Sequence, residues 1–238
     1  MVEFDTGICH QRVIRNREMD TDPQPIMTSL DGCYVEQISR QECMDIILRY
    51  EWLGTMNTAP KAFYGLRTPR GLAGVASFGL GHGTKQRDFC GSENAHLAIG
   101  LERGACVHWA HPHAGSFLVQ RAIKLATEDH GWHLYYAYSD VEAGEIGTIY
   151  QACNWYYLGQ GVGRKSKYRN HVIVFAVVSC PAKRKVAALK TRSGKPSSIS
   201  QMRAARGPLI AAQDSIASLT PVISDAQAIK SETKEKMA

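Results

Sequence analysis

Three side chains of this sequence are suited to proton transfer. Tyr150 lies on a predicted short helix, where its phenol can protonate a leaving thiolate. Asp140 ends the strand-like run HLYYAYSD, and open α/β sheets place their sites at the carboxyl ends of strands. Arg103 lies inside another strand-like run, so its charge needs a partner, for which Glu102, Asp140 or a ligand is available. The alternatives are a core tyrosine and a structural ion pair.

A loop of small and polar residues precedes the predicted helix over 115–130. It contains His113, Ala114, Gly115 and Ser116. The free N–H groups and the positive dipole end at a helix N-terminus bind phosphate, so this loop suits a pyrophosphate such as that of coenzyme A. An ordinary helix start is the alternative interpretation.

Histidines gather around the same loop, close to Cys106. His108 and His111 are the candidate ligands for iron or another metal, although H-x-x-H-x-H is not a standard zinc spacing. A polar rim without a metal is the alternative. Trp109, in this polar loop, is the candidate for stacking on a nucleobase.

The basic residues of the chain are concentrated near its C-terminus. Residues 1–180 hold 17 Lys and Arg against 18 Asp and Glu, whereas residues 181–238 hold 11 against 4. This pattern favours contact with nucleic-acid phosphates, and a disordered, solubilising tail is the alternative. The DNA-contacting candidates are Arg164, Lys165, Lys167, Arg169, Lys183, Arg184 and Lys185.

Local signals predict a mixed α/β protein. Ser39 and Glu42 form a capping-box pattern at the start of a helix that runs to about Gly54. Apolar runs around TPRG predict a β-hairpin. The predicted strands cover 33–38, 62–66, 71–80, 101–108, 133–139, 155–159 and 169–179, and two further helices cover 115–130 and 143–154, the latter ending at Asn154.

Composition sets the organisation that we expect. The 238 residues suit one domain with tails: a loose arm over 1–27, a catalytic domain over 28–180 and a basic extension over 181–238. The sequence contains neither a long apolar run nor a signal-peptide pattern, so no membrane contact is expected. Seven scattered cysteines without a CxxC pair predict reduced thiols in the cytoplasm.

Four segments together resemble the phage Mom family, which is related to the DNA-modification protein of bacteriophage Mu. They are YEWLGT at 50–55, LERGACVHWAHPHAGS at 101–116, YAYSD at 136–140 and AGEIGTIYQACNW at 143–155. The resemblance covers roughly residues 33–180, and its motifs recur in the same order.

This resemblance implies a variant of the GCN5-related N-acetyltransferase fold, with a mixed central sheet flanked by helices and acetyl-CoA or a related acyl donor. It further implies conversion of adenine to N6-carbamoylmethyl (acetamido) adenine, which shields phage DNA from host restriction enzymes. Arg103, Asp140 and Tyr150 match functional positions of the family. Glu51 and Trp52 are further candidates for catalysis by their position, although this chain departs there from the His-Tyr pair of its relatives.

Double-stranded DNA would be the partner, and the enzyme would have to extrude the adenine because its N6 lies within the base stack. The product joins N6 to a methylene carbon and carries an amide nitrogen, which an ordinary acetyl transfer does not provide. Two other functions fit the residues: an acetyl-CoA-dependent N-acetyltransferase acting on a protein or small amine, and a DNA-binding module on an inactive fold. An exposed strand edge also allows two copies to pair as a homodimer.

Overall fold

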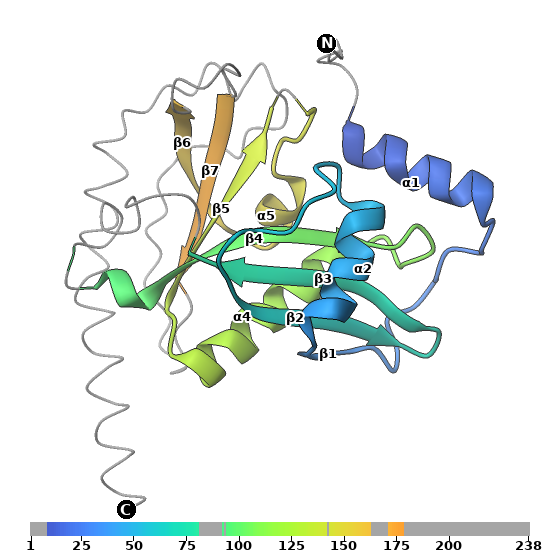
Figure 1. The fold of residues 1–238 in the computed structure, drawn as a ribbon, viewed down its shortest axis with the longest axis horizontal. Helices are drawn as coiled ribbons and strands as arrows, with labels where there is room; N and C mark the ends of the chain where they lie inside the picture. The colour runs from blue at the N-terminus through green and yellow to red at the C-terminus, as the bar shows by residue number, and fades with distance from the viewer. Residues whose placement is uncertain (1–8, 81–91, 93, 142, 163–170, 179–238) are drawn as a thin grey trace, which may run out of the picture.

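One seven-stranded mixed sheet organises the protein (Figure 1). The computed structural model describes residues 9–80, 92, 94–141, 143–162 and 171–178. The strands are β1 (Tyr34–Gln37), β2 (Pro60–Thr68), β3 (Gly71–Gly79), β4 (Ala98–Cys106), β5 (Leu134–Asp140), β6 (Tyr156–Val162) and β7 (His171–Val178), in the order β1-β2-β3-β4-β5-β7-β6. The predicted class, a mixed sheet flanked by helices, is confirmed, whereas the basic extension lies outside the described residues.

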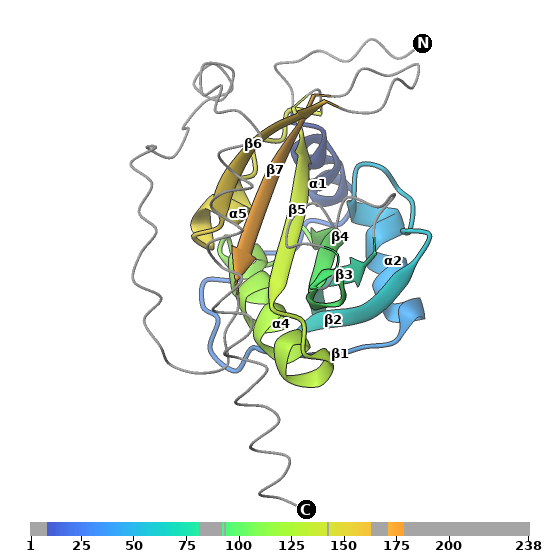
Figure 2. The ribbon, with the colours of Figure 1, turned by 90° about the vertical axis from the view of Figure 1, so that its left-hand side faces the viewer.

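Helices α2 (Arg40–Tyr50) and α4 (Ala114–His130) cover opposite faces of this sheet (Figure 2). Successive residues of β2 face opposite sides of the sheet, as Tyr64 and Gly65 show. The Tyr64 hydroxyl donates a hydrogen bond to Asp129 of α4 at 2.9 Å, whereas a Cβ on Gly65 would meet Ile38, just before α2, at 2.8 Å. The predicted capping box of α2 is confirmed. No helix of the described part is both long and apolar enough to span a bilayer.

The sheet opens between its two parallel strands, β4 and β5. Their pairing is confined to Ala98–Leu101 and Leu134–Ala137, and β5 then continues beside β7. Glu102 is the extra residue of a β-bulge in β4, which bends the strand at this point. The strands therefore diverge where the predicted residues Arg103 and Asp140 follow (Figures 1 and 2).

The N-terminal arm contains a helix, α1 (His10–Thr21), so the prediction of a loose arm is wrong for this segment. The sequence did not indicate it because the helix is polar almost all round and has no side-chain N-cap. Its stabilisation is tertiary: the Glu18 carboxylate lies 2.6 Å from Arg49 of α2. Glu18 is also paired with Arg17 at 2.8 Å.

The second predicted helix of the site region is shorter than expected. Instead of covering 143–154, α5 spans Thr148–Ala152, because Gly144 and Gly147 have φ values of 74° and 69°, which interrupt a right-handed helix. The helix ends two residues before the predicted Asn154, which has a φ of 59° and cannot continue a right-handed helix. A short 3-10 helix, η1 (Ala95–Leu97), leads into β4, which starts three residues before its predicted position.

Candidate active site

Arg103 of β4 points to the loop that follows α2. Its Nε donates to the carbonyl oxygen of Thr55 at 2.8 Å, and its Nη1 donates to that of Glu102 at 2.7 Å. Two carbonyl oxygens thus hold the guanidinium in place, and it remains close enough to Glu51 to lower the pKa of that carboxyl group. Of the partners predicted for Arg103, Glu102 contacts the guanidinium through its backbone carbonyl oxygen.

Glu51 follows the last residue of α2 and is buried. Its Oε2 accepts hydrogen bonds from the N–H groups of Leu53 at 2.9 Å and Gly54 at 3.2 Å. Burial raises the pKa of Glu51, and Arg103 and these two N–H groups oppose that rise. Its neighbour Trp52 is partly buried, with its ring centroid 6.3 Å from that of His10.

A second carboxylate that was not among the candidates joins Asp140. The Glu145 N–H donates to the Asp140 carbonyl at 2.9 Å, so the chain turns back directly after β5. Burial, and then the charges of Glu51 and Asp140, raise the pKa of Glu145 to about 7. The sequence does contain a signal for this residue: an acidic side chain between two glycines, directly after a strand end.

Tyr150 lies on α5 with its ring centroid 4.9 Å from that of Trp155, and it is partly buried. Burial raises its pKa, as do the nearby Glu145, Cys153 and Glu51 in that order. The phenol therefore keeps its proton at neutral pH, which is the state that a general acid needs.

The fold thus brings Arg103, Asp140 and Tyr150 into one electrostatic cluster with Glu51 and Glu145. Burial and the neighbouring charges of Glu51 and Asp140 raise the pKa of Glu145 to about 7, so this carboxyl group exchanges its proton near neutral pH. A protonated phenol beside such a carboxylate provides an acid and a base in one place.

The predicted phosphate-binding turn lies at the start of α4, and His113 is its N-cap residue. The N–H of Ala114 donates to His111 O at 2.8 Å, and that of Phe117 donates to His113 O at 3.0 Å. Those of Gly115 and Ser116 are therefore left at the open end of the helix as donors for an anion. These residues fit the pyrophosphate of coenzyme A.

Helix α5 packs directly against this turn, which links the turn to Tyr150. A Cβ on Gly115 would come within 3.1 Å of the Ile149 Cδ1 atom, and the Cys153 thiol donates to the Ser116 carbonyl at 3.5 Å. Gly115 is thus required by a close approach of the two helices. Because Ile149 precedes Tyr150, the anion-binding end of α4 and the phenol belong to one structural unit.

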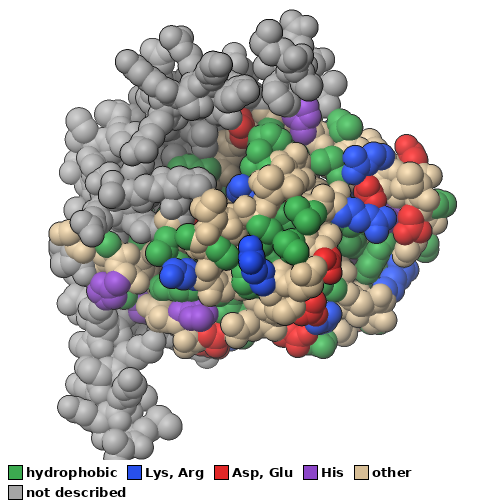
Figure 3. All heavy atoms as spheres, viewed as in Figure 1, with side chains coloured by type: hydrophobic (Ala, Val, Ile, Leu, Met, Phe, Trp, Pro, Cys, Tyr) green, Lys and Arg blue, Asp and Glu red, His purple; other side chains and the backbone are tan. Residues whose placement is uncertain are grey.

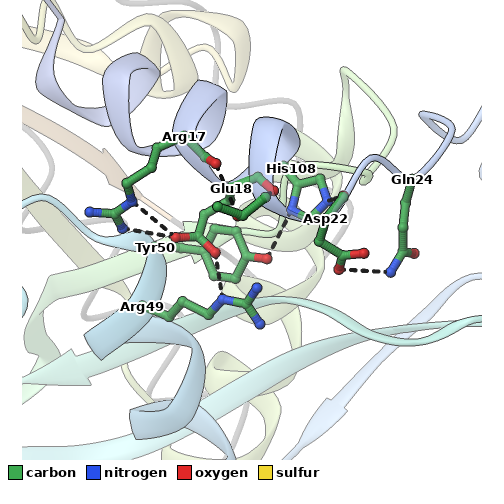
Figure 4. Close-up of polar contacts among 8 residues, drawn as sticks. Arg17, Glu18, Asp22, Gln24, Arg49, Tyr50 and His108 are labelled. Atoms are coloured by element: carbon green, nitrogen blue, oxygen red, sulfur yellow. Dashed lines mark hydrogen bonds and ion pairs between the residues drawn. The ribbon is translucent and has the colours of Figure 1, made fainter.

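The prediction that His108 ligates a metal is wrong, because its ring is fully buried and both ring nitrogens are engaged (Figure 4). Nδ1 lies 2.9 Å from the Tyr50 hydroxyl, and Nε2 lies 2.8 Å from the Asp22 carbonyl oxygen. The carbonyl can only accept, so Nε2 carries a hydrogen. His111 Nδ1 accepts from the His113 N–H at 3.1 Å, and no group of three or more potential ligands for a metal ion occurs among the described residues.

Trp109 is also structural, so the prediction that it stacks on a nucleobase is wrong. Its side chain is 8% exposed and belongs to the hydrophobic core, with the Arg70 guanidinium 5.9 Å from its ring centroid. The polar loop in which it lies is covered by the N-terminal segment, whose Met27 N–H donates to the Trp109 carbonyl at 2.9 Å.

The candidate DNA-contacting residues of 164–169 and 183–185 lie outside the described part of the chain. On the face seen in Figure 3, Lys and Arg side chains lie interspersed with Asp and Glu and do not form a patch of one sign.

A mixed sheet that opens beside a phenol, an arginine and three carboxylates defines an α/β protein with an acid–base site. The chain belongs to the Mom protein family, whose model matches residues 32–202, and this confirms the resemblance inferred from its motifs. Comparison with curated protein sequences gives no match.

The backbone is similar to those of several solved acetyltransferases. An IAA acetyltransferase from Bacillus cereus is 13% identical, with a TM-score of 0.44 over 62% of this chain and 100% of the other. A ribosomal-protein-S5-alanine acetyltransferase from Vibrio fischeri is 7% identical, with a TM-score of 0.45 over 64% of this chain and 96% of the other. A spermidine N-acetyltransferase from Vibrio cholerae, in complex with CoA and spermine, is 11% identical, with a TM-score of 0.42 over 61% of this chain and 95% of the other. Nothing about activity follows from likeness at this level.

Proposed function

We propose that this protein modifies adenine at N6 in DNA, by group transfer from an acyl donor such as acetyl-CoA, and so protects phage DNA from host restriction enzymes. N6-carbamoylmethyladenine is the product that its family resemblance implies. The observation that carries the proposal is the meeting of Tyr150 with Glu51 and Glu145 at the opening of the sheet, in a chain of the Mom family.

Each residue of the cluster has a chemical task in this proposal. Glu145 accepts the proton that the adenine amine loses as it forms its new bond, since its carboxyl group has a pKa of about 7 and exchanges protons near neutral pH. Asp140, whose carbonyl accepts from the Glu145 N–H, orients that amine. Tyr150 supplies a proton to the leaving group. Arg103 favours the charged form of Glu51, whose carboxylate is held in place by the N–H groups of Leu53 and Gly54.

The first turn of α4 would hold the donor. Gly115 and Ser116 offer backbone N–H groups to a pyrophosphate, and an acyl thioester, when bound, supplies a carbon that an amine can attack. The proposed product bonds N6 to a methylene carbon and contains an amide nitrogen. The complete reaction therefore needs two co-reactants besides the thioester. One is a nitrogen source, which forms the amide and displaces coenzyme A as the thiolate that Tyr150 protonates. The other is a two-electron oxidant, which allows the methyl carbon to lose a hydrogen and bond to N6.

Contact with DNA is assigned to the basic extension after Cys180. Its eight Lys and Arg residues between 181 and 213, without an acidic residue, suit a phosphate backbone. Removal of the extension should weaken DNA binding and make the affinity less dependent on salt. A plot of the logarithm of the affinity against the logarithm of the salt concentration should become less steep by about 0.9 for every phosphate contact removed. Unchanged affinity and salt dependence in a filter-binding titration would exclude the extension as the DNA contact.

The experiment that tests the function is mass spectrometry of nucleosides from cells that express the protein. Wild type should yield an N6-modified adenine, Tyr150→Phe should yield only adenine, and both should have the same circular dichroism spectrum. Tyr34→Phe is the matched control, because Tyr34 is 55% exposed on β1, the edge strand farthest from β6 in the strand order. Ordinary adenine alone in the wild-type digest would refute the proposal.

A second candidate is acetyl transfer to a protein or small amine. The free N–H groups at the start of α4 favour it equally, because they fit an acyl-CoA whatever the acceptor is. This function predicts release of coenzyme A upon addition of an amine without DNA. The proposed function predicts release only when DNA is present.

A further inference from the structure

Helix α1 precedes the residues that the family model matches, since that match begins at residue 32. Nevertheless, it contacts both loops that carry the carboxylates of the site. One loop follows α2 and begins with Glu51. The other joins β5 to α5 and contains Glu145.

The first residue of α1 lies between these two loops. The His10 N–H donates to the Ala143 carbonyl at 3.1 Å, and its ring is tilted by 32° against that of Trp52. Ala143 is buried and lies two residues before Glu145. His10 therefore contacts the β5–α5 loop through its backbone and the α2 loop through its side chain.

The second residue of α1 fixes the end of α2. The Gln11 Nε2 atom donates to the Tyr50 carbonyl at 2.6 Å. The last four carbonyl groups of a helix lack intrahelical donors, so Gln11 satisfies one of them. This carbonyl belongs to the peptide that leads into Glu51, whose carboxylate in turn holds the N–H groups of Leu53 and Gly54.

The rest of α1 anchors it to the core (Figure 4). An Arg15 Nη2 donates to the His108 carbonyl at 3.1 Å. Glu18 lies 2.6 Å from Arg49, as Figure 4 shows. At the C-terminal end, the Asp22 carbonyl accepts from His108 Nε2. The first turn of α1 is thus held in a defined place against the site.

We infer that α1 is a wall of the acceptor site and that Gln11 is a positioning residue, which acts on Glu51 through the end of α2. His10 supports the β5–α5 loop in the same way. The inference rests on the proposed function for only one of its three measurements, the modified adenine.

The test uses Gln11→Glu in the full chain, which keeps the size of the side chain but removes its N–H donor. Val13→Ala is the matched control, because Val13 lies on the same helix and is 49% exposed. The measurements are the modified adenine in cellular DNA, the hydrogen exchange of the Leu53 and Gly54 amides, and the urea midpoint.

We expect Gln11→Glu to accelerate exchange at these two amides by about three- to tenfold, the range expected when a hydrogen bond of about 1 kcal/mol is lost. Modified adenine should fall by a similar factor, and the urea midpoint should fall by no more than the loss of this one bond implies, whereas the Val13→Ala protein should remain unchanged. His10→Ala keeps the backbone bond to Ala143 but removes the ring that contacts Trp52, so it should lower modification and also accelerate exchange at these two amides; it serves as the second variant if Gln11→Glu does not fold.

Exchange and modification that stay at the wild-type level in Gln11→Glu would overturn the inference. A uniform acceleration of exchange with a lower urea midpoint would also overturn it, because α1 would then be only a structural support. If wild type itself gives no modified adenine, the proposed function fails, and the exchange measurement still decides the role of Gln11.

Discussion

Replacement of Glu145 by glutamine should stabilise the protein, and more so as the pH rises. The Glu145 carboxyl group titrates at about 7 in the folded protein, against an ordinary value of 4.5. A raised pKa means that folding disfavours the charged form. The resulting destabilisation is absent well below pH 4.5, grows as the pH rises, and is complete above pH 7.

The magnitude follows from the difference of about two and a half pH units, which corresponds to about 3 kcal/mol. This is an upper limit, because part of the side chain is in contact with water. Glutamine has nearly the same shape and carries no charge. We therefore expect Glu145→Gln to have a higher free energy of unfolding than wild type by up to about 3 kcal/mol at about pH 8, and by much less at about pH 5.

Urea unfolding of both proteins at these two pH values measures the effect, because all other titrating groups are common to them and cancel in the difference. Glu128→Gln, at an exposed position of α4, is the control and should show no such pH dependence. The reasoning is refuted if wild type and Glu145→Gln differ by the same amount at both pH values. The variant should also lose adenine modification, since it cannot accept a proton.

Two further predictions concern the core. Gly65→Ala should lower the free energy of unfolding by about 1–3 kcal/mol in urea titrations. The reason is that its Cβ would lie 2.6 Å from Leu72 Cδ1 and 2.8 Å from Ile38 Cγ2. An unchanged midpoint would show that the sheet and the start of α2 are less closely packed here. Tyr50→Phe should cost about 1–3 kcal/mol in the same assay, because it removes the partner of the buried His108 Nδ1; a difference near zero would argue against that hydrogen bond.

Local residue chemistry determined most of the secondary structure of this protein. Ser39 and Glu42 place the start of α2 because a capping box acts within four residues. The helix after the small-residue loop and the left-handed Asn154 that follows α5 depend on equally local backbone preferences. Tyr150, Asp140 and Arg103 were recognisable as one set because their motifs recur in a fixed order within a family.

Only the tertiary structure decided what these residues contact. Glu145 became a site residue because β4 and β5 diverge and a turn returns the chain beside Asp140, far in sequence from Glu51. His108 lies next to candidate metal ligands in sequence, yet contacts from α1 and α2 occupy both its nitrogens. The sequence alone determined the local elements and the reactive side chains, because these depend on neighbours along the chain. The environment of each side chain, and hence its pKa and its role, depends on segments that only folding brings together.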